Sequence, residues 1–177
     1  MQQFCAPPLI PFVSFDFPAL LTTIRTRHFP NVALSISANF LKASRARSES
    51  LASINFGGAV ADIRIHEILN RADTPEEVIE HILKHEILHI VIRPRQIDSR
   101  TVKHPPEFWE AEKRISPERE EAWDWLSIAL IAHLRIDEKR EAAMIRRGWE
   151  RSISNPFPTF ADARELSNPD TVKSGYI

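Results

Sequence analysis

The 177-residue sequence contains a single cysteine, Cys5. One thiol cannot form an intramolecular disulfide, and it excludes four-cysteine zinc ribbons and iron–sulfur clusters built within the chain. A metal site must therefore use histidines and carboxylates, and the sequence has seven histidines. Glycine is also scarce, with four residues, and none stands in a phosphate-loop pattern. Together these absences favour a site built on a helix over one built on a glycine-rich loop.

Long hydrophobic runs and a charge of one sign are also absent. The N-terminal segment has no basic region, and the richest apolar stretch, residues 125–134, is too short for a membrane helix. We therefore expect a cytoplasmic protein with no membrane partner. The net charge of −1 gives no general attraction to nucleic acid. The length predicts one domain in residues 1–155, followed by a proline-rich tail in residues 156–177 that is extended or partly disordered.

Hydrophobic periodicity divides the chain into a β-rich first part and a helical second part. Strands are predicted where apolar residues alternate with period two, at residues 32–40, 51–56 and 61–69. Helices are predicted at residues 17–28 with Asp16 as cap, 74–92, from Pro106, after Ser116-Pro117, and 137–151. A basic loop is expected at residues 93–103. The fold class is therefore α+β, with a small antiparallel or mixed sheet packed on the helix of residues 74–92 and with C-terminal helices.

The helix of residues 74–92 carries the clearest functional motif in the sequence. Thr74, Pro75 and Glu77 match a capping box at its start, and apolar residues on most of its sides mark it as a buried central helix. It contains HExxH as His85-Glu86-Ile87-Leu88-His89. Chance would give only about 0.02 copies of this motif in a chain of this composition. We therefore interpret this helix as an active-site helix.

The spacing of HExxH suits zinc chemistry. His85 and His89 lie one turn apart on the same helix face, so both can bind one ion. Zinc held by histidine nitrogens keeps a position open for water and lowers the pKa of that water to about 7. Glu86 is rotated by about 100° from His85, so it can accept a proton as a general base rather than bind the metal. Ordinary helix residues are the simpler alternative, but burying such groups without partners is costly.

A third ligand is needed, and His104 is the leading candidate. It lies fifteen residues after His89 and directly precedes Pro105-Pro106, which hold the chain extended and then start a helix. The alternatives are that His104 is a solvated loop residue or that a glutamate on a later helix completes the site. The candidate glutamates are Glu107, Glu110, Glu120 and Glu121, although first-turn carboxylates favoured by the helix dipole explain the last two better.

The segments HEILH and HPPEFWEAEKRI, with 14 residues between them, resemble the SprT-like and YgjP-like zinc metallopeptidases. In this family HExxH is followed by a short spacer and by a histidine with an aromatic residue three to five positions later. The similarity covers about residues 20–115. It implies a zincin-type fold that binds one zinc ion through His85, His89 and His104 and uses Glu86 as the general base. It also implies a peptide or unfolded-protein substrate held along an edge strand.

The sequence departs from the SprT-like pattern in two respects. Pro105 follows the third histidine where that pattern usually has glycine, which is closer to the YgjP-like form. The only tyrosine, Tyr176, lies in the tail, so backbone donors, an arginine or a histidine would have to stabilise the oxyanion.

Other functions stay open at this point. One alternative is a catalytically silent zincin-fold module that binds metal and acts in protein or nucleic-acid interaction. Another is nucleic-acid binding through the basic residues, which gather at residues 42–47 and at Arg93, Arg95, Arg100 and Lys103. A solvated loop is the simpler interpretation of both groups. His81 is expected to be a partly exposed helix residue, with a contact behind the metal site or to substrate as the alternative, and His66 to be structural or at the rim.

Overall fold

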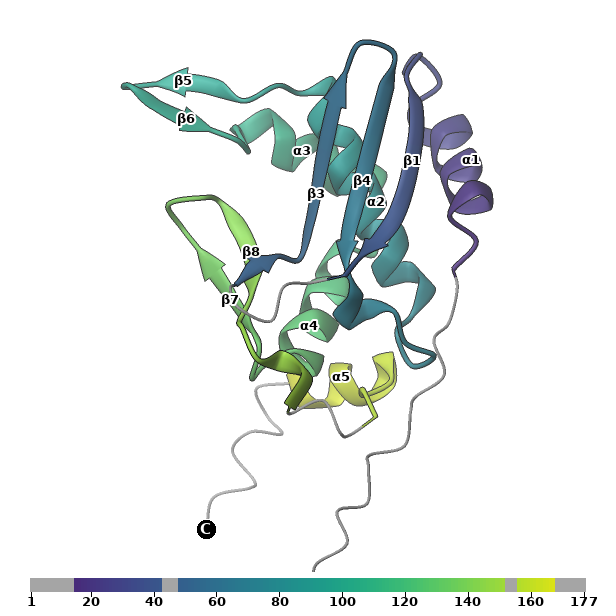
Figure 1. Cartoon of the computed structure of the whole chain (residues 1–177), viewed down its shortest axis with the longest axis vertical. Coiled ribbons are helices and arrows are strands. Elements are labelled where there is room, and N and C mark those ends of the chain that lie inside the picture. The colour runs from purple at the N-terminus through teal and green to yellow at the C-terminus, as the bar shows by residue number, and fades with distance from the viewer. Residues whose placement is uncertain (1–14, 43–47, 152–155, 168–177) are drawn as a thin grey trace, which may run out of the picture.

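The computed structural model describes residues 15–42, 48–151 and 156–167 of the chain. It is an α+β fold, as predicted (Figure 1). The elements are α1 (Phe17–His28), β1 (Ser35–Leu41), β2 (Glu49–Ser50), β3 (Ala52–Gly57), β4 (Val60–His66), η1 (Glu67–Leu69), α2 (Glu76–Val91), β5 (Arg95–Ile97), β6 (Arg100–Val102), α3 (Pro106–Ile115), α4 (Arg119–Ala129), β7 (Leu134–Asp137), β8 (Ala142–Ile145), η2 (Trp149–Arg151) and α5 (Phe160–Ser167).

The main sheet is small and mixed. It has the order β1-β4-β3, with β1 parallel and β3 antiparallel to the central strand β4. Along β4, Ala61, Ile63 and Ile65 are buried and face the helical layer, whereas Asp62 and Arg64 alternate with them on the outer face. This alternation is the period-two pattern of the sequence. The predicted third strand ends at His66, after which the chain turns into η1.

Helix α2 lies behind the sheet in Figure 1 and packs against β3, α1, α3 and α4. Its side chains are buried on several faces, which confirms the predicted central helix. The capping box is wrong. The helix begins at Glu76 with Pro75 at the cap position and no side-chain cap, and the buried Thr74 hydroxyl has no hydrogen-bond partner among the described residues. The Thr74 backbone N–H donates to the Arg71 carbonyl in a preceding turn, and Thr74 lies one residue before the cap position of the helix.

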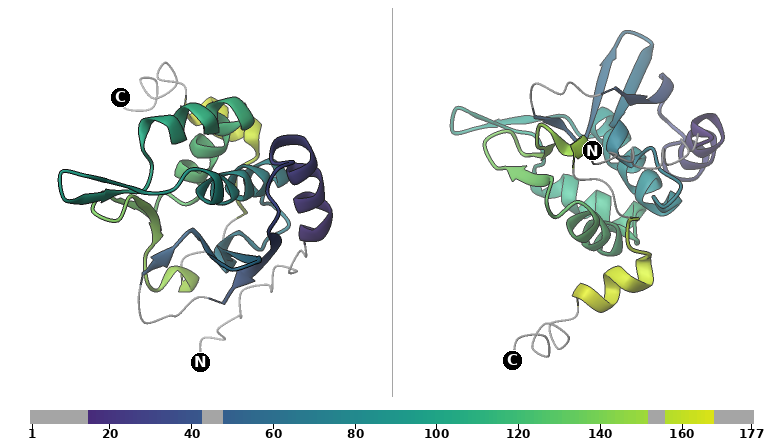
Figure 2. Two further views of the ribbon diagram at one scale, coloured as in Figure 1. Left: turned by 90° about the horizontal axis from the view of Figure 1, so that it is seen from above. Right: turned by 60° about the horizontal axis from the view of Figure 1, so that its bottom comes forward.

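The C-terminal part differs most from the prediction. The predicted helix of residues 137–151 is wrong apart from the single turn of η2, because β7 and β8 make an antiparallel hairpin that pairs with β2. Met144 and Ile145 of β8 are buried at this pairing, and burial in a sheet outweighs the helical propensity of the segment. The basic loop of residues 93–103 is also a hairpin, β5–β6, which projects from the body in every view (Figures 1 and 2).

The proline-rich tail is not wholly extended, since residues 160–167 form α5, which packs against α4 (Figure 2). Phe157 is buried in the core against Trp125, and the Trp125 indole N–H donates to the Pro158 carbonyl at 2.7 Å. In the part of the chain that the structure describes, no helix is both long and apolar enough to cross a membrane.

Candidate metal centre

Three histidines that are far apart in sequence meet at the C-terminal half of α2. His85 and His89 project from one face of the helix, and His104 comes from the loop between β6 and α3, where buried Pro105 precedes the helix. One nitrogen from each ring lies within 4.8 Å of the other two, so the three residues could hold a metal ion. This is the ligand set that the sequence predicted.

The distance between two of these nitrogens fits a small ion. His89 Nε2 and His104 Nε2 are 3.2 Å apart. Two nitrogens that each lie 2.0–2.1 Å from one tetrahedral zinc ion are about 3.3 Å apart. Imidazole nitrogens are also donors that zinc prefers. The three residues therefore fit a zinc ion in donor type, and His89 and His104 also fit it in spacing.

Phe108 supports all three imidazoles from one side. Its fully buried ring lies 5.0 Å from His85, 4.7 Å from His89 and 4.8 Å from His104 between ring centroids. On the outer side Trp109 lies 4.9 Å from His104. The aromatic pair noted after His104 in the sequence therefore packs directly on the ligands, and each ring restricts how far the imidazoles can turn.

Burial sets the charge state of the site. It lowers the pKa of His89 to about 3, with further lowering by His85 and His104. It also lowers the pKa of His104 to about 4. Both imidazoles are therefore neutral near pH 7, which is the form that binds metal. Glu86 is 6% exposed, and burial raises the pKa of its carboxyl group.

Two carboxylates that the sequence analysis missed contact two of the histidines. Glu112 of α3 is fully buried and lies 2.6 Å from His85 Nδ1. Burial alone would raise its pKa, but the hydrogen bond and charge of His85 and the contact with Arg119 lower it to about 2. Glu112 lies one turn after buried Phe108, so a carboxylate on the apolar face of this helix was the available signal.

The second is Glu141, in the turn between β7 and β8. One of its oxygens accepts hydrogen bonds from the backbone N–H groups of Lys103 at 2.8 Å and His104 at 3.0 Å, and it lies 3.5 Å from His104 Nδ1. Glu141 has a positive φ of 47°, a strained conformation for a residue other than glycine. No local pattern marks this residue, because it reaches the site only through the fold of the hairpin.

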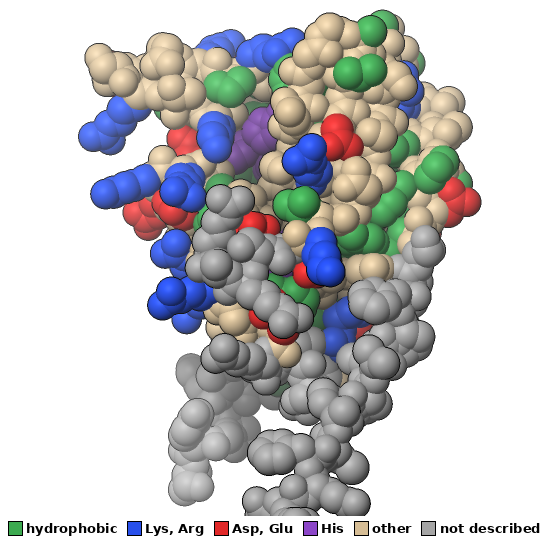
Figure 3. All heavy atoms as spheres, in the orientation of Figure 1, with side chains coloured by type: hydrophobic (Ala, Val, Ile, Leu, Met, Phe, Trp, Pro, Cys, Tyr) green, Lys and Arg blue, Asp and Glu red, His purple; other side chains and the backbone are tan. Residues whose placement is uncertain are grey.

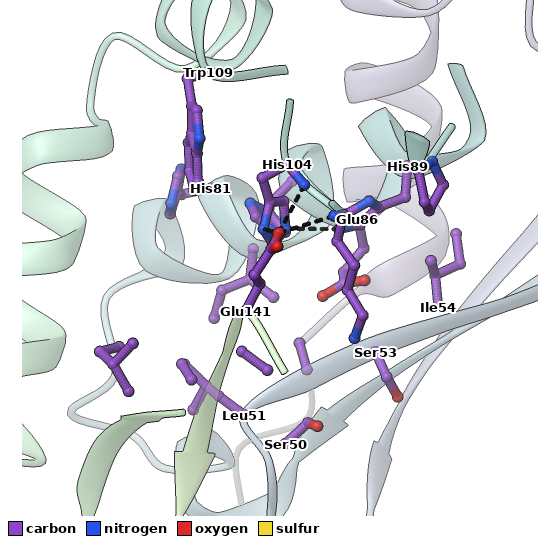
Figure 4. A pocket seen from close by; sticks show the side chains of 18 of the residues that line it. Ser50, Leu51, Ser53, Ile54, His81, Glu86, His89, His104, Trp109 and Glu141 are labelled. Carbon is purple, nitrogen blue, oxygen red and sulfur yellow. Dashed lines mark hydrogen bonds and ion pairs between the residues drawn. The ribbon is translucent and has the colours of Figure 1, made fainter. Parts of the chain in front are cut away.

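The histidines lie at the bottom of a cleft of about 720 Å³. In Figure 3 histidine side chains are visible in a hollow between the projecting hairpin and the main sheet. Edge strand β3 lines one wall with Ser53 and Ile54, and the β7–β8 hairpin lines another with Glu141 (Figure 4). Glu86 lines the same cleft. A ligand that enters the cleft therefore meets the edge of a sheet, the carboxylate of Glu86 and the three histidines together.

The alternative third ligands do not join the histidines. Glu107 pairs with Arg95 at 2.6 Å, Glu121 pairs with Arg164, and Glu110 and Glu120 are exposed. Among the described residues, only the three histidines form a group that could hold a metal.

His81 is not exposed as predicted: it is 1% exposed and lines the cleft. Its Nδ1 lies 2.9 Å from Ser116 Oγ, and burial lowers its pKa to about 4. His66 is buried and structural, as one of the two predictions had it, and its Nδ1 accepts a hydrogen bond from the Ile68 N–H. Cys5, Tyr176 and residues 43–47 of the first basic group lie outside the described residues.

Of the second basic group, only Lys103 lines the cleft. The four members of this group are exposed on or beside the β5–β6 hairpin. Arg95 pairs with Glu107, and the Arg93 guanidinium lies 4.5 Å above the Phe56 ring. These two residues therefore have partners within the protein.

In comparisons with known proteins, no protein-family model matches the chain and no curated protein matches it. The site therefore has to be interpreted from its own geometry.

Proposed function

We propose that this protein is a zinc-dependent metallopeptidase that hydrolyses peptide bonds, of the type that the SprT-like and YgjP-like resemblance implies. The observation that carries the proposal is the meeting of His85, His89 and His104 beside Glu86 at the bottom of one open cleft. A zinc ion bound there would polarise the scissile carbonyl and lower the pKa of a water molecule. A site with three protein ligands leaves a position open for this chemistry.

The chain's own residues supply the remaining functions. Glu86 lines the cleft on the same helix as two of the ligands, so its carboxylate can take the proton of an attacking water and deliver it to the leaving amine. Burial keeps bulk water away from this carboxylate. Among the described residues β3 is an edge strand, and its Ser53 and Ile54 line the cleft, so an extended peptide can bind along this edge by β-augmentation. The proposed substrate is therefore an extended or unfolded polypeptide.

The test is the cleavage of an unfolded protein by zinc-loaded wild type and by zinc-loaded Glu86→Gln. Glutamine keeps the size of the side chain but cannot accept the proton. We expect the variant to bind zinc as the wild type does and to lose at least about 100-fold in rate, because general-base catalysis contributes 10²–10⁴-fold. Equal rates would remove Glu86 from the mechanism. Zinc binding without cleavage by the wild type would instead indicate a silent metal-binding module.

Glu110→Gln is a matched control, since this glutamate is exposed on α3 and contributes nothing to the cleft lining. Its rate should equal that of the wild type. A similar loss in both variants would mean that the assay reports a general effect of removing negative charge.

A further inference from the structure

A buried carboxylate and an arginine connect two of the three histidines from behind. Glu112 is fully buried between α2 and α3. Its Oε1 lies 2.6 Å from His85 Nδ1, and its Oε2 accepts a hydrogen bond from Arg119 Nε at 2.6 Å. Both carboxylate oxygens are therefore engaged, one by a metal-site histidine and the other by the first residue of α4.

The same arginine extends the connection to a second histidine. The Arg119 guanidinium lies 5.4 Å from the centroid of the Trp109 ring, within the range of a cation–π contact. Trp109 in turn stands beside His104, with 4.9 Å between ring centroids (Figure 4). Contacts thus run from His85 through Glu112, Arg119 and Trp109 to His104. The two ends of this chain of contacts are metal-site histidines from different parts of the sequence.

The contact with Glu112 selects one form of His85. A neutral imidazole carries its hydrogen on either Nδ1 or Nε2, and the partner of one nitrogen decides which form is present. A carboxylate only accepts hydrogen bonds, so it favours the hydrogen on Nδ1 of His85. Nε2 is then left with a free lone pair. Without Glu112, nothing among the contacts of the described residues would favour this form over the other.

Arg119 offsets the free-energy cost of burying the Glu112 carboxylate. A carboxylate buried without a counter-charge is strongly destabilising, and removing one partner of a buried pair leaves that cost uncompensated. The Arg119 side chain is 33% exposed, so its own charge stays partly hydrated while it neutralises Glu112. The arginine therefore allows a carboxylate to remain behind His85 in the core.

We propose that Glu112 and Arg119 are positioning residues of the metal centre. Glu112 holds His85 in the form with the hydrogen on Nδ1, which leaves Nε2 free to bind the ion. Arg119 fixes the position of Glu112 and also restricts the movement of His104 through its contact with Trp109. This inference rests on the proposed zinc site, but it assigns roles to two residues on α3 and α4 that are neither part of HExxH nor members of the three-histidine group. Neither residue is among those that line the cleft.

Two measurements on purified full-length protein test the proposal. The first is zinc affinity by competition with a chromophoric chelator, for the wild type, Glu112→Ala, Glu112→Gln and Arg119→Ala. Partners behind metal-binding histidines contribute 10–100-fold to metal affinity, so Glu112→Ala should lose about this factor. Glu112→Gln should lose less than about tenfold, since its amide oxygen can still accept from Nδ1. Arg119→Ala should also weaken zinc binding.

The second measurement is the ¹⁵N NMR spectrum of the histidine side chains in the metal-free protein. The wild type and Glu112→Gln should show His85 with its hydrogen on Nδ1, and Glu112→Ala should show a mixture of both forms. A merely structural role for Glu112 would not change the form of His85. The wild-type and glutamine spectra suffice if the alanine variant does not fold.

Asp73→Asn is the matched control. Asp73 is a half-buried carboxylate that, like Glu112, is bound by an arginine, here Arg71, but it precedes α2 and lies at the opposite end of that helix from the histidines. It should lower stability and leave zinc affinity within about twofold of wild type, because distant sites act independently. The proposal is overturned if Glu112→Ala binds zinc as tightly as wild type, or if wild-type His85 carries its hydrogen on Nε2. A wild type that binds no zinc overturns the proposed function instead. The NMR measurement uses metal-free protein, so it tests the effect of Glu112 on His85 whether or not zinc binds.

Discussion

Replacing Phe108 with alanine should damage the fold and the metal centre together. The Phe108 ring is fully buried and lies within 5.0 Å of His85, His89 and His104, centroid to centroid. Truncating a buried phenylalanine costs about 3–5 kcal/mol, through lost transfer free energy and the cavity left behind. The same cavity would free the imidazoles to turn away from one another, so zinc affinity should fall as well.

The assay is urea denaturation of wild type and Phe108→Ala, each without metal and with a fixed excess of free zinc. The metal-free proteins should differ by about 3–5 kcal/mol in the free energy of unfolding. Zinc stabilises a folded protein by an amount set by the ratio of free zinc to the dissociation constant. The difference between the two proteins should therefore widen when zinc is present.

Leu83→Ala is the matched control, because Leu83 is also fully buried, but its position on α2 is rotated by about 200° from His85 and so faces away from the histidines. It should cost about 2–5 kcal/mol and leave the zinc effect unchanged. The reasoning is refuted if Phe108→Ala loses less than about 1 kcal/mol, or if zinc stabilises it as much as it stabilises Leu83→Ala.

Three further predictions concern other parts of the fold. Burial lowers the pKa of His66 from 6.5 to about 4. As the pH falls, His66 therefore becomes protonated in the unfolded chain before it does so in the folded protein, and the free energy of unfolding should fall by up to about 3 kcal/mol between pH 6.5 and 4. His66→Gln should show a shallower fall in urea denaturation across this range. Glu141→Ala removes the acceptor for the Lys103 and His104 amides. Hydrogen exchange of these two amides should become about tenfold faster, and an unchanged rate would argue that Glu141 does not hold this segment. Phe157→Ala should cost about 3 kcal/mol because its ring packs on Trp125 in the core; a loss within 0.5 kcal/mol, the usual range for surface substitutions, would show that this segment is peripheral.

The part of the site that could be predicted from sequence is the part encoded by local geometry. The i and i+4 positions of His85 and His89 bring them to one face of any helix, and Pro105 and Pro106 limit where the chain can place His104. Glu112 could not be assigned in this way. Its contact with His85 exists only because α3 packs on α2, and no spacing along the chain encodes that packing.

The errors in the fold have a similar cause. Residues 137–145 are rich in good helix formers, yet Glu141 adopts a positive φ and turns the chain back so that β8 can pair with β2 and β7. Strand pairing across distant segments outweighed local propensity there. The cap of α2 was predicted one residue too early for a local reason. The Thr74 backbone N–H belongs to the preceding turn, and this leaves Pro75 at the cap position. Propensity alone does not distinguish two adjacent cap positions.

The zinc content of the protein purified without chelator tests the central claim most directly. We predict about one zinc ion per chain for the wild type and a large loss in His104→Ala, since a site with two histidines binds zinc far more weakly than one with three. Less than about half an equivalent in the wild type purified in this way would contradict the metal centre. Full retention of zinc by His104→Ala would contradict the assignment of its third ligand.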